Sequence, residues 1–218
     1  MPRRLREQLI LDIAGQVFAR GGYHFASMDA IAERAGVSKP MIYSYFGSKE
    51  GLYVAYVHRA GRELLDRLLG AAGRDDPPLV QLRARIAEFL SFVEEHRDGW
   101  IVLFTEMSCS RPLEDEVSRR RHQIADAVRR MVEASVSGYE KAIHAAGGEE
   151  AIHAADDEQA MHLASDGIAH AIVGAGESLA NWWLEHPDVD REQVADWYFG
   201  IVQGAVPAAL RPSISGRP

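Results

Sequence analysis

The sequence predicts an all-α protein, and three observations support this prediction. Apolar residues recur at spacings of three and four along most of the 218-residue chain. Runs in which β-branched and polar residues alternate, as in half-buried strands, do not occur. Glycines, prolines and capping serines divide the pattern into segments of helical length.

The composition is that of a globular protein, since 47% of the residues are hydrophobic and 26% are charged. No apolar stretch reaches the roughly 18 residues that a membrane span requires. Near the N-terminus, Glu7, Gln8 and Asp12 interrupt the apolar residues at helical spacing, which indicates an amphipathic helix rather than a signal peptide. We therefore expect a cytoplasmic protein without a membrane partner.

Four helices are predicted in the first third of the chain. Glycines end the first three, and serines occupy the N-cap positions of the last three, where a side-chain oxygen accepts from a free backbone N–H. The predicted ranges are Arg3–Arg20, Ser27–Ala35, Ser38–Phe46 and Ser48 to about Leu69.

The rest of the chain is predicted to be helical between two loops at 70–78 and 147–158. The expected helices are Leu79–Glu95, Trp100–Ser108, Leu113 to about Ala145, Gln159 to about His186, and Asp190–Leu210. We expect a first domain over residues 1–50, a larger helical domain over 51–212 and a tail over 213–218.

The second and third helices, joined by the sequence AGVS at 35–38, have the pattern of a helix-turn-helix. In that motif the N-terminal residues of the second helix face base edges in the major groove of DNA. Here these residues are Lys39, Pro40 and Met41. Lys39 can donate to guanine, and the other two can contact a thymine methyl group.

Other residues of this region are suited to the DNA backbone. Tyr43 and Tyr45 carry hydroxyls that can donate to phosphate, while Ile42 anchors the helix inside. Ser27 and Lys49 lie at the starts of the flanking helices, where free N–H groups favour anions. The alternative is that these residues are ordinary caps and solvated surface.

The charge distribution is compatible with DNA as a partner although the net charge is −8. Residues 1–50 contain seven Lys or Arg and five Asp or Glu, a balance of +2, which leaves −10 for the remainder. A mildly basic N-terminal part can approach phosphates while an acidic body stays away from them.

The stretch FASMDAIAERAGVSKPMIYSYFGSKEGLY at 25–53 resembles the N-terminal domain of TetR-family transcriptional regulators. The resemblance consists of many residue types at fixed offsets, and beyond this stretch it extends only to the helical architecture. By position it implies that Lys39, Pro40 and Met41 read bases. It also implies that a second group contacts the DNA backbone: Ser27, Ser38, Tyr43, Tyr45 and Lys49.

The resemblance further implies a homodimer that pairs through its last two long helices. Stripes of small and apolar residues on these helices allow such pairing, and core packing within one chain is the alternative. The candidate dimer residues are Ala169, Ile172, Val173, Gly176, Ala180, Trp183, Ile201, Val202 and Ala205.

A small-molecule effector is also implied, bound in an apolar pocket of the larger domain. The candidate pocket residues are apolar or aromatic, and two histidines supply polar groups. The alternative is that these residues belong to the hydrophobic core and bind no ligand. They are Phe89, Phe92, Trp100, Phe104, Met107, His122, Met131, Tyr139 and His170.

The function implied is that of a repressor that binds a palindromic operator as a dimer and is released by a largely apolar molecule. A regulator that binds DNA only with its ligand has the same pattern, and a helix-turn-helix used for protein contacts is a further alternative. Salt dependence separates DNA binding from apolar protein contacts.

Metal and enzyme chemistry are weaker alternatives. His162, Asp166 and His170 share one helix face at spacings of four, which suits Zn or Fe, but scattered solvated histidines fit equally. A di-iron bundle needs two Glu-x-x-His motifs, and only Glu150 and His153 have that spacing. No phosphate-binding glycine loop or nucleophile elbow is present, so we expect neither a cofactor nor catalysis.

Overall fold

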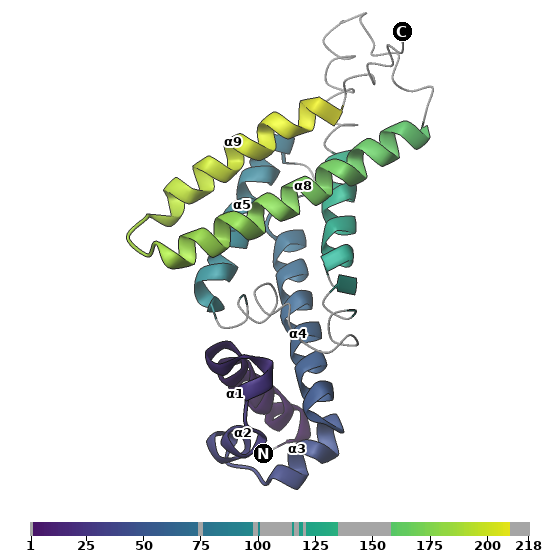
Figure 1. The fold of residues 1–218 in the computed structure, drawn as a ribbon. Helices are drawn as coiled ribbons and strands as arrows, with labels where there is room; N and C mark the ends of the chain where they lie inside the picture. The colour runs from purple at the N-terminus through teal and green to yellow at the C-terminus, as the bar shows by residue number, and fades with distance from the viewer. Residues whose placement is uncertain are drawn as a thin grey trace, which may run out of the picture. The chain divides into compact units, whose positions relative to one another are not determined.

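The computed structural model describes residues 2–73, 76–97, 100, 115, 118–119, 121–134 and 158–209. Within these ranges all regular structure is helical, so the predicted all-α fold is confirmed (Figure 1). The elements are α1 (Arg3–Phe25), α2 (Met28–Ala35), α3 (Lys39–Phe46), α4 (Lys49–Gly70), α5 (Pro78–Glu95), a helical segment at 121–134, α8 (Glu158–Glu185) and α9 (Arg191–Ala209). None of these described helices is long and apolar enough to cross a membrane.

Most predicted helix boundaries agree with the structure to within two residues. The predicted helix at 100–108 lies outside the described residues except for Trp100, and the one at 113–145 is described mainly over 121–134. The first helix is the exception, because it extends beyond the predicted glycine stop. Gly22 leaves the helical conformation with φ 72° and ψ 165°, and one further turn follows it to Phe25.

The chain forms two compact units. One comprises Met1–Asp66 and Phe92–His122, and the other comprises Arg67–Ser91 and Gln123–Pro218. The boundary at residue 50 between two functional domains remains a prediction.

An aromatic cluster holds the N-terminal helices together. The turn after Gly22 places Tyr23 in the core, where its ring lies 6.2 Å from Phe18 and 5.2 Å from Tyr53 of α4. Phe18 and Tyr53 meet edge to face at 5.2 Å. Such edge-to-face pairs stabilise the packing beyond the burial of their area, so the kink at Gly22, which places Tyr23 here, contributes to the packing of α1 against α4.

Two glycines of the first unit allow close approaches that a methyl group would prevent. A Cβ on Gly15 would lie 2.3 Å from Cε2 of Tyr56, a buried side chain of α4. A Cβ on Gly51, in the first turn of α4, would lie 2.0 Å from the carbonyl oxygen of Phe46 at the end of α3. The direction in which α4 leaves α3 therefore depends on Gly51.

In the second unit, α8 and α9 run side by side (Figure 1). The hydroxyl of Tyr198 on α9 donates to the carbonyl oxygen of Ile172 on α8 at 2.8 Å. This approach passes over Gly176, where a Cβ would lie 2.6 Å from the Tyr198 hydroxyl. Burial raises the pKa of Tyr198 well above its ordinary value, so the hydroxyl remains a donor.

Helix α5 packs against α9 through aromatic and polar contacts. The ring of Phe89 lies 5.8 Å from that of Tyr198. Arg83 donates to Asp196 at 2.8 Å, and its guanidinium lies 4.5 Å from the centre of the Phe199 ring. These contacts join α9 to α5 on one side and to α8 on the other.

Replacing Gly51 with Ala should destabilise the protein by about 1–3 kcal/mol, because the new methyl group meets a backbone oxygen that has little freedom to move. The measurement is urea or thermal unfolding. Gly21→Ala is the matched control, since its methyl group would meet only Cβ of Phe25 at 3.8 Å and should leave stability unchanged or slightly higher. Equal stability of Gly51→Ala and wild type would contradict the proposed close approach.

Candidate nucleic-acid interface

Helices α2 and α3 form the predicted helix-turn-helix, with both serine caps in place. The Oγ of Ser27 accepts from the N–H of Ala30 at 3.3 Å. The Oγ of Ser38 accepts from the N–H of Met41 at 3.4 Å. Gly36 ends α2 with φ 63°, in the left-handed region that glycine enters without strain.

Burial divides α3 into an inner and an outer face. Ile42 is 0% exposed and holds the helix against the core. Pro40 and Tyr43 are exposed, while Lys39 and Met41 are half-buried. The three residues predicted to read bases therefore lie at the free N-terminal end of α3, as the motif requires.

Lys39 forms an ion pair that the sequence did not predict. Its Nζ donates to Oδ2 of Asp29 on α2 at 2.9 Å. The hydrogen bond and the charge of Asp29 raise the pKa of Lys39, so the ammonium form is favoured. Asp29 and Lys39 are ten positions apart on different helices, and no sequence spacing rule identifies such a pair.

Tyr45 faces the start of α1 rather than open solvent. Nη1 of Arg6 lies 3.4 Å from the Tyr45 hydroxyl, and the Arg3 guanidinium lies 5.0 Å from the centre of the ring. Arg3 and Arg6 were not among the predicted site residues. The basic sequence PRRLR at 2–6 was a signal for them, but only the fold places them beside α3.

Lys49 connects the end of α1 with the start of α4. Its Nζ donates to the carbonyl oxygen of His24 at 3.1 Å and lies 4.7 Å from the centre of the Tyr23 ring. The Tyr23 hydroxyl donates to Glu50 at 2.7 Å, and this hydrogen bond is the main reason that the pKa of Glu50 is lowered. Two of the three ammonium donors of Lys49 remain for other acceptors.

Comparisons with known proteins agree with this geometry. Residues 10–56 match the family described as bacterial regulatory proteins, tetR family, and residues 78–145 match the tetracyclin repressor-like C-terminal domain. A TetR-like transcriptional regulator from Rhodococcus sp. RHA1 has a solved structure that is 30% identical, with a TM-score of 0.71 over 95% of this chain and 98% of that chain. The chain belongs to the TetR family.

Curated relatives are similar over part of their length. The HTH-type transcriptional activator FasR of Mycolicibacterium smegmatis is 38% identical over 104 residues, 48% of each chain. The HTH-type transcriptional regulator RutR of Escherichia coli K12 is 32% identical over 111 residues, 50% of each chain. These matches span about half the length of the curated relatives. The TetR family and these relatives are regulators rather than enzymes, in agreement with the prediction of no catalysis.

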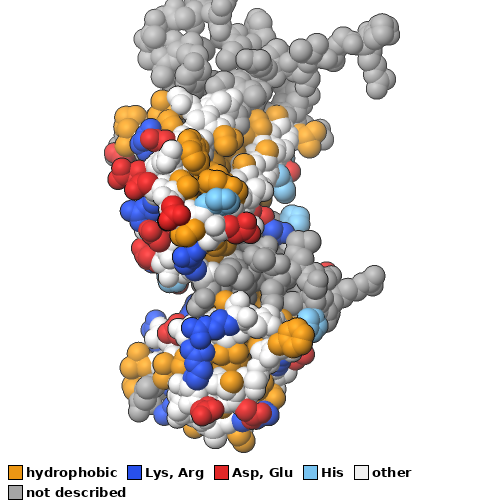
Figure 2. Space-filling view, turned by 60° about the vertical axis from the view of Figure 1, so that its left-hand side comes forward, with side chains coloured by type: hydrophobic (Ala, Val, Ile, Leu, Met, Phe, Trp, Pro, Cys, Tyr) orange, Lys and Arg blue, Asp and Glu red, His pale blue; other side chains and the backbone are white. Residues whose placement is uncertain are grey.

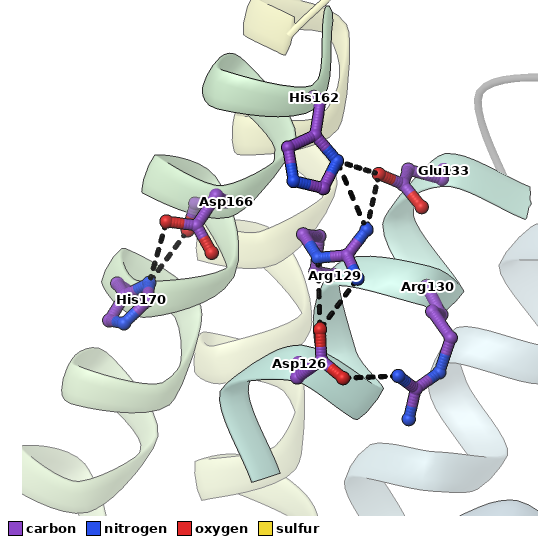
Figure 3. A network of polar contacts seen from close by, with 7 residues as sticks. All are labelled: Asp126, Arg129, Arg130, Glu133, His162, Asp166 and His170. Atoms are coloured by element: carbon purple, nitrogen blue, oxygen red, sulfur yellow. Dashed lines mark hydrogen bonds and ion pairs between the residues drawn. The ribbon is translucent and has the colours of Figure 1, made fainter. Parts of the chain in front are cut away.

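Among the three residues of the metal hypothesis, His162 contacts residues outside the set, while Asp166 and His170 contact each other (Figure 3). Nδ1 of His162 lies 3.3 Å from Nη1 of Arg129 and 3.4 Å from Oε1 of Glu133. His170 turns instead to Asp166, with Nδ1 2.9 Å from its carbonyl oxygen.

A guanidinium beside His162 opposes a metal cation at that ring. Arg129 is fixed there by ion pairs to Asp126 and Glu133, and Asp126 also pairs with Arg130. Among the described residues, no group of three potential ligands is arranged to hold a metal ion.

The predicted effector residues differ in exposure. Phe92 and Trp100 are buried in the first unit, and Phe89 and Met131 are half-buried in the second. His122 and His170 are exposed on their helices. Phe104, Met107 and Tyr139 lie outside the described residues, so their role as pocket residues remains a prediction.

One polar residue of the second unit was not among the predicted effector residues. Arg85 of α5 is partly buried, and its Nε is shielded from solvent and has no hydrogen-bond partner within the described ranges. Its Nη2 donates to Gln81 at 2.9 Å, and burial lowers its pKa. No carboxylate among the described residues pairs with it. The residue was not recognised because a single arginine on a helix carries no distinctive pattern.

Most of the residues predicted for the dimer interface are covered within this chain, and their part in a dimer remains a prediction. Gly176 illustrates the reason, because its missing side chain admits Tyr198 of the same chain. Val173 is half-buried, Ile201 is 53% exposed, and the side chain of Ala205 lies outside the described residues. The covered residues are Ala169, Ile172, Gly176, Ala180, Trp183 and Val202.

Proposed function

We propose that this TetR-family chain is a ligand-responsive repressor that binds a palindromic DNA operator as a homodimer and is released by a small, largely apolar molecule. The observation that carries the proposal is α3 of the helix-turn-helix, whose buried Ile42 leaves Pro40 and Tyr43 exposed beside Lys39 at the N-terminal half of the helix. Such a protein acts in the cytoplasm, where bacterial DNA lies.

In the proposed complex, Lys39, Pro40 and Met41 read base edges in the major groove. Backbone contacts come from two directions around them. Tyr45 has Arg3 and Arg6 beside it, and these guanidiniums extend the predicted backbone contacts toward the start of α1. The complete set of proposed backbone contacts is Arg3, Arg6, Ser27, Ser38, Tyr43, Tyr45 and Lys49.

Dimerisation is supported by apolar side chains that remain exposed on the last two helices. Trp182 of α8 is 37% exposed, and Trp197 and Ile201 of α9 are 44% and 53% exposed. Figure 2 shows exposed hydrophobic side chains on the molecular surface between charged ones. On the same two helices, a Cβ added at Gly174 or Gly200 would meet no atom within 4 Å. A partner helix could therefore approach the backbone closely at these glycines. We propose that Trp182, Trp197 and Ile201 form the centre of the dimer interface, with Val173 at its edge.

The effector is proposed to act by a shift between two conformations of the dimer. One conformation holds the two α3 helices of the dimer at a spacing that does not fit the operator, and a ligand that binds better to this conformation weakens DNA binding. The loss of DNA-binding free energy cannot exceed the difference in the ligand's binding free energy for the two conformations. Helix α4, which begins after α3 and contributes residues to both compact units, is the proposed lever.

A ligand-dependent activator is the second candidate function. The observation that favours it is the 38% identity to FasR, which is named a transcriptional activator. The two functions differ only in which conformation the effector stabilises.

Arg85 adds a chemical requirement for the effector. Nη2 of Arg85 is satisfied by Gln81, but its buried Nε has no hydrogen-bond partner among the described residues. A buried donor without an acceptor is costly unless an anion or a carbonyl oxygen of a ligand reaches it. We therefore propose that the effector combines an apolar body with a hydrogen-bond acceptor that binds Arg85.

The decisive experiment selects random duplex DNA with the purified protein and then measures binding at two salt concentrations. Enrichment of a palindrome with an affinity that falls steeply as salt rises would support the operator proposal. If no sequence is enriched with or without cell extract, the helix-turn-helix serves another partner.

The interface predicts different effects for Arg6 and Lys39. Arg6→Ala should weaken binding to all sequences alike and reduce the salt slope by about one, because one phosphate contact is lost. Lys39→Ala should relax the preference at one base position and cost about 1–3 kcal/mol there. Filter binding to the selected duplex and to single-base variants measures both. A change of base preference in Arg6→Ala would refute the assignment of Arg6 to phosphate.

The proposed dimer interface predicts that Ile201→Glu converts the protein to monomers, because a partner would bury the new charge. Sedimentation velocity measures the effect. Leu79→Glu is the matched control, since Leu79 of α5 has a similar exposure of 52% but lies outside the proposed interface. Loss of the dimer in both variants, or in neither, would count against the interface.

The proposed role of Arg85 predicts that Arg85→Met weakens the response to an effector about tenfold or more, because a charge-assisted hydrogen bond is lost. The effector is first found by screening molecules for release of the selected duplex. Affinity for DNA without effector should stay within about twofold of wild type, since Arg85 lies outside the proposed DNA contacts. An unchanged effector concentration at half-release would exclude Arg85 from the site.

A further inference from the structure

The pair between Asp29 and Lys39 lies at the corner where α2 meets α3. Asp29 is in the first turn of α2, and Lys39 is the first residue of α3. Their Nζ and Oδ2 atoms are 2.9 Å apart, while the side chains remain 41% exposed for Lys39 and 73% exposed for Asp29.

This pair is not needed to hold the two helices together. Ile31, Ala32, Ala35 and Ile42 are buried between α2, α3 and the rest of the core. An exposed ion pair adds little to stability beside such packing because water screens it. Its position beside the base-reading end of α3 therefore calls for a functional explanation.

We propose that Asp29 is a specificity-determining residue of the DNA interface, which holds the Lys39 ammonium for a base acceptor and withholds it from phosphate. The inference rests on the proposed function, since it assumes that Lys39 reads a base. Asp29 itself is assigned no contact with DNA.

The first part of the argument concerns the donors of Lys39. An ammonium group has three N–H donors, and one of them points to Asp29. Two donors remain, and guanine presents two acceptors, O6 and N7, at its major-groove edge. The contact with Asp29 restricts an otherwise flexible side chain, so less conformational entropy is lost when Lys39 meets the base.

The second part concerns DNA that lacks the right base. If Lys39 swings away from the reading end of α3 toward a phosphate, its pair with Asp29 breaks, and an unpaired carboxylate then faces a negatively charged backbone. Both changes oppose binding to random sequence. With a guanine in place the pair stays intact, so the carboxylate disfavours random DNA more than the operator.

Asp29→Asn tests the inference against a matched charge control on the same helix. Glu33→Gln also removes one negative charge from α2, and Glu33 is exposed and forms no ion pair among the described residues. Affinities of wild type and both variants are measured for the selected duplex and for a random duplex, each over a range of salt. Thermal unfolding of all three proteins checks that α2 remains folded.

The expected result for Asp29→Asn is an affinity for random duplex that rises about fivefold, with the selected duplex bound within about twofold of wild type. The salt slope on random duplex should become steeper by about 0.9, because the released Lys39 gains one phosphate. Glu33→Gln should leave the ratio of the two affinities and the slope unchanged. In a Lys39→Ala background, Asp29→Asn should no longer change the ratio.

The inference is overturned if Asp29→Asn and Glu33→Gln change both affinities by the same factor, because net charge alone would then explain the effect. It is also overturned if Asp29→Asn changes the ratio equally without Lys39. Failure of the proposed function is a different result, since wild type itself would then prefer no duplex.

Discussion

The burial of Ile42 is the constraint on which the proposed interface depends. This side chain is fully enclosed, and it fixes the rotation of an eight-residue helix about its own axis. Because neighbouring residues of a helix point about 100° apart, one anchored position determines which residues face solvent. Pro40 and Tyr43 are exposed for this reason, and the glycines around α3 allow the chain to turn into and out of it.

The cations around α3 are held by partners of the protein before any DNA is present. Lys39 pairs with Asp29, Lys49 donates to His24, and Arg6 contacts Tyr45. Each contact restricts a flexible side chain and lowers the entropy cost of a later contact. Asp29 differs from the other two partners because it carries a full negative charge beside the reading end of the helix. In the proposed complex its charge discriminates between DNA sites, whereas a carbonyl or a hydroxyl mainly positions its cation.

The last two helices use small residues for packing within the chain. Gly176 gives Tyr198 access to the backbone of α8, and Ala169 and Ala180 are enclosed in the same unit. The larger side chains of Trp182 and Trp197 remain exposed, and exposed aromatic residues of this kind support the proposed dimer interface. The proposed interface uses the two helices predicted for dimerisation and centres on the side chains that remain exposed there, among them the predicted residue Ile201.

The sequence alone determined the helical fold, most helix boundaries and the helix-turn-helix, because periodicity, caps and glycine stops are local signals. It also placed the base-reading candidates, since Ser38 and Gly47 delimit α3 directly. Tertiary structure decided the partners of Lys39, Tyr45 and Lys49, which lie on other helices. A stripe of small residues on α8 suits packing against a helix of the same chain and against a helix of a second chain equally well, so the sequence leaves this choice open. The tertiary structure shows which side of α8 is enclosed within the chain. Those contacts depend on how helices pack in space, and linear spacing does not encode that packing.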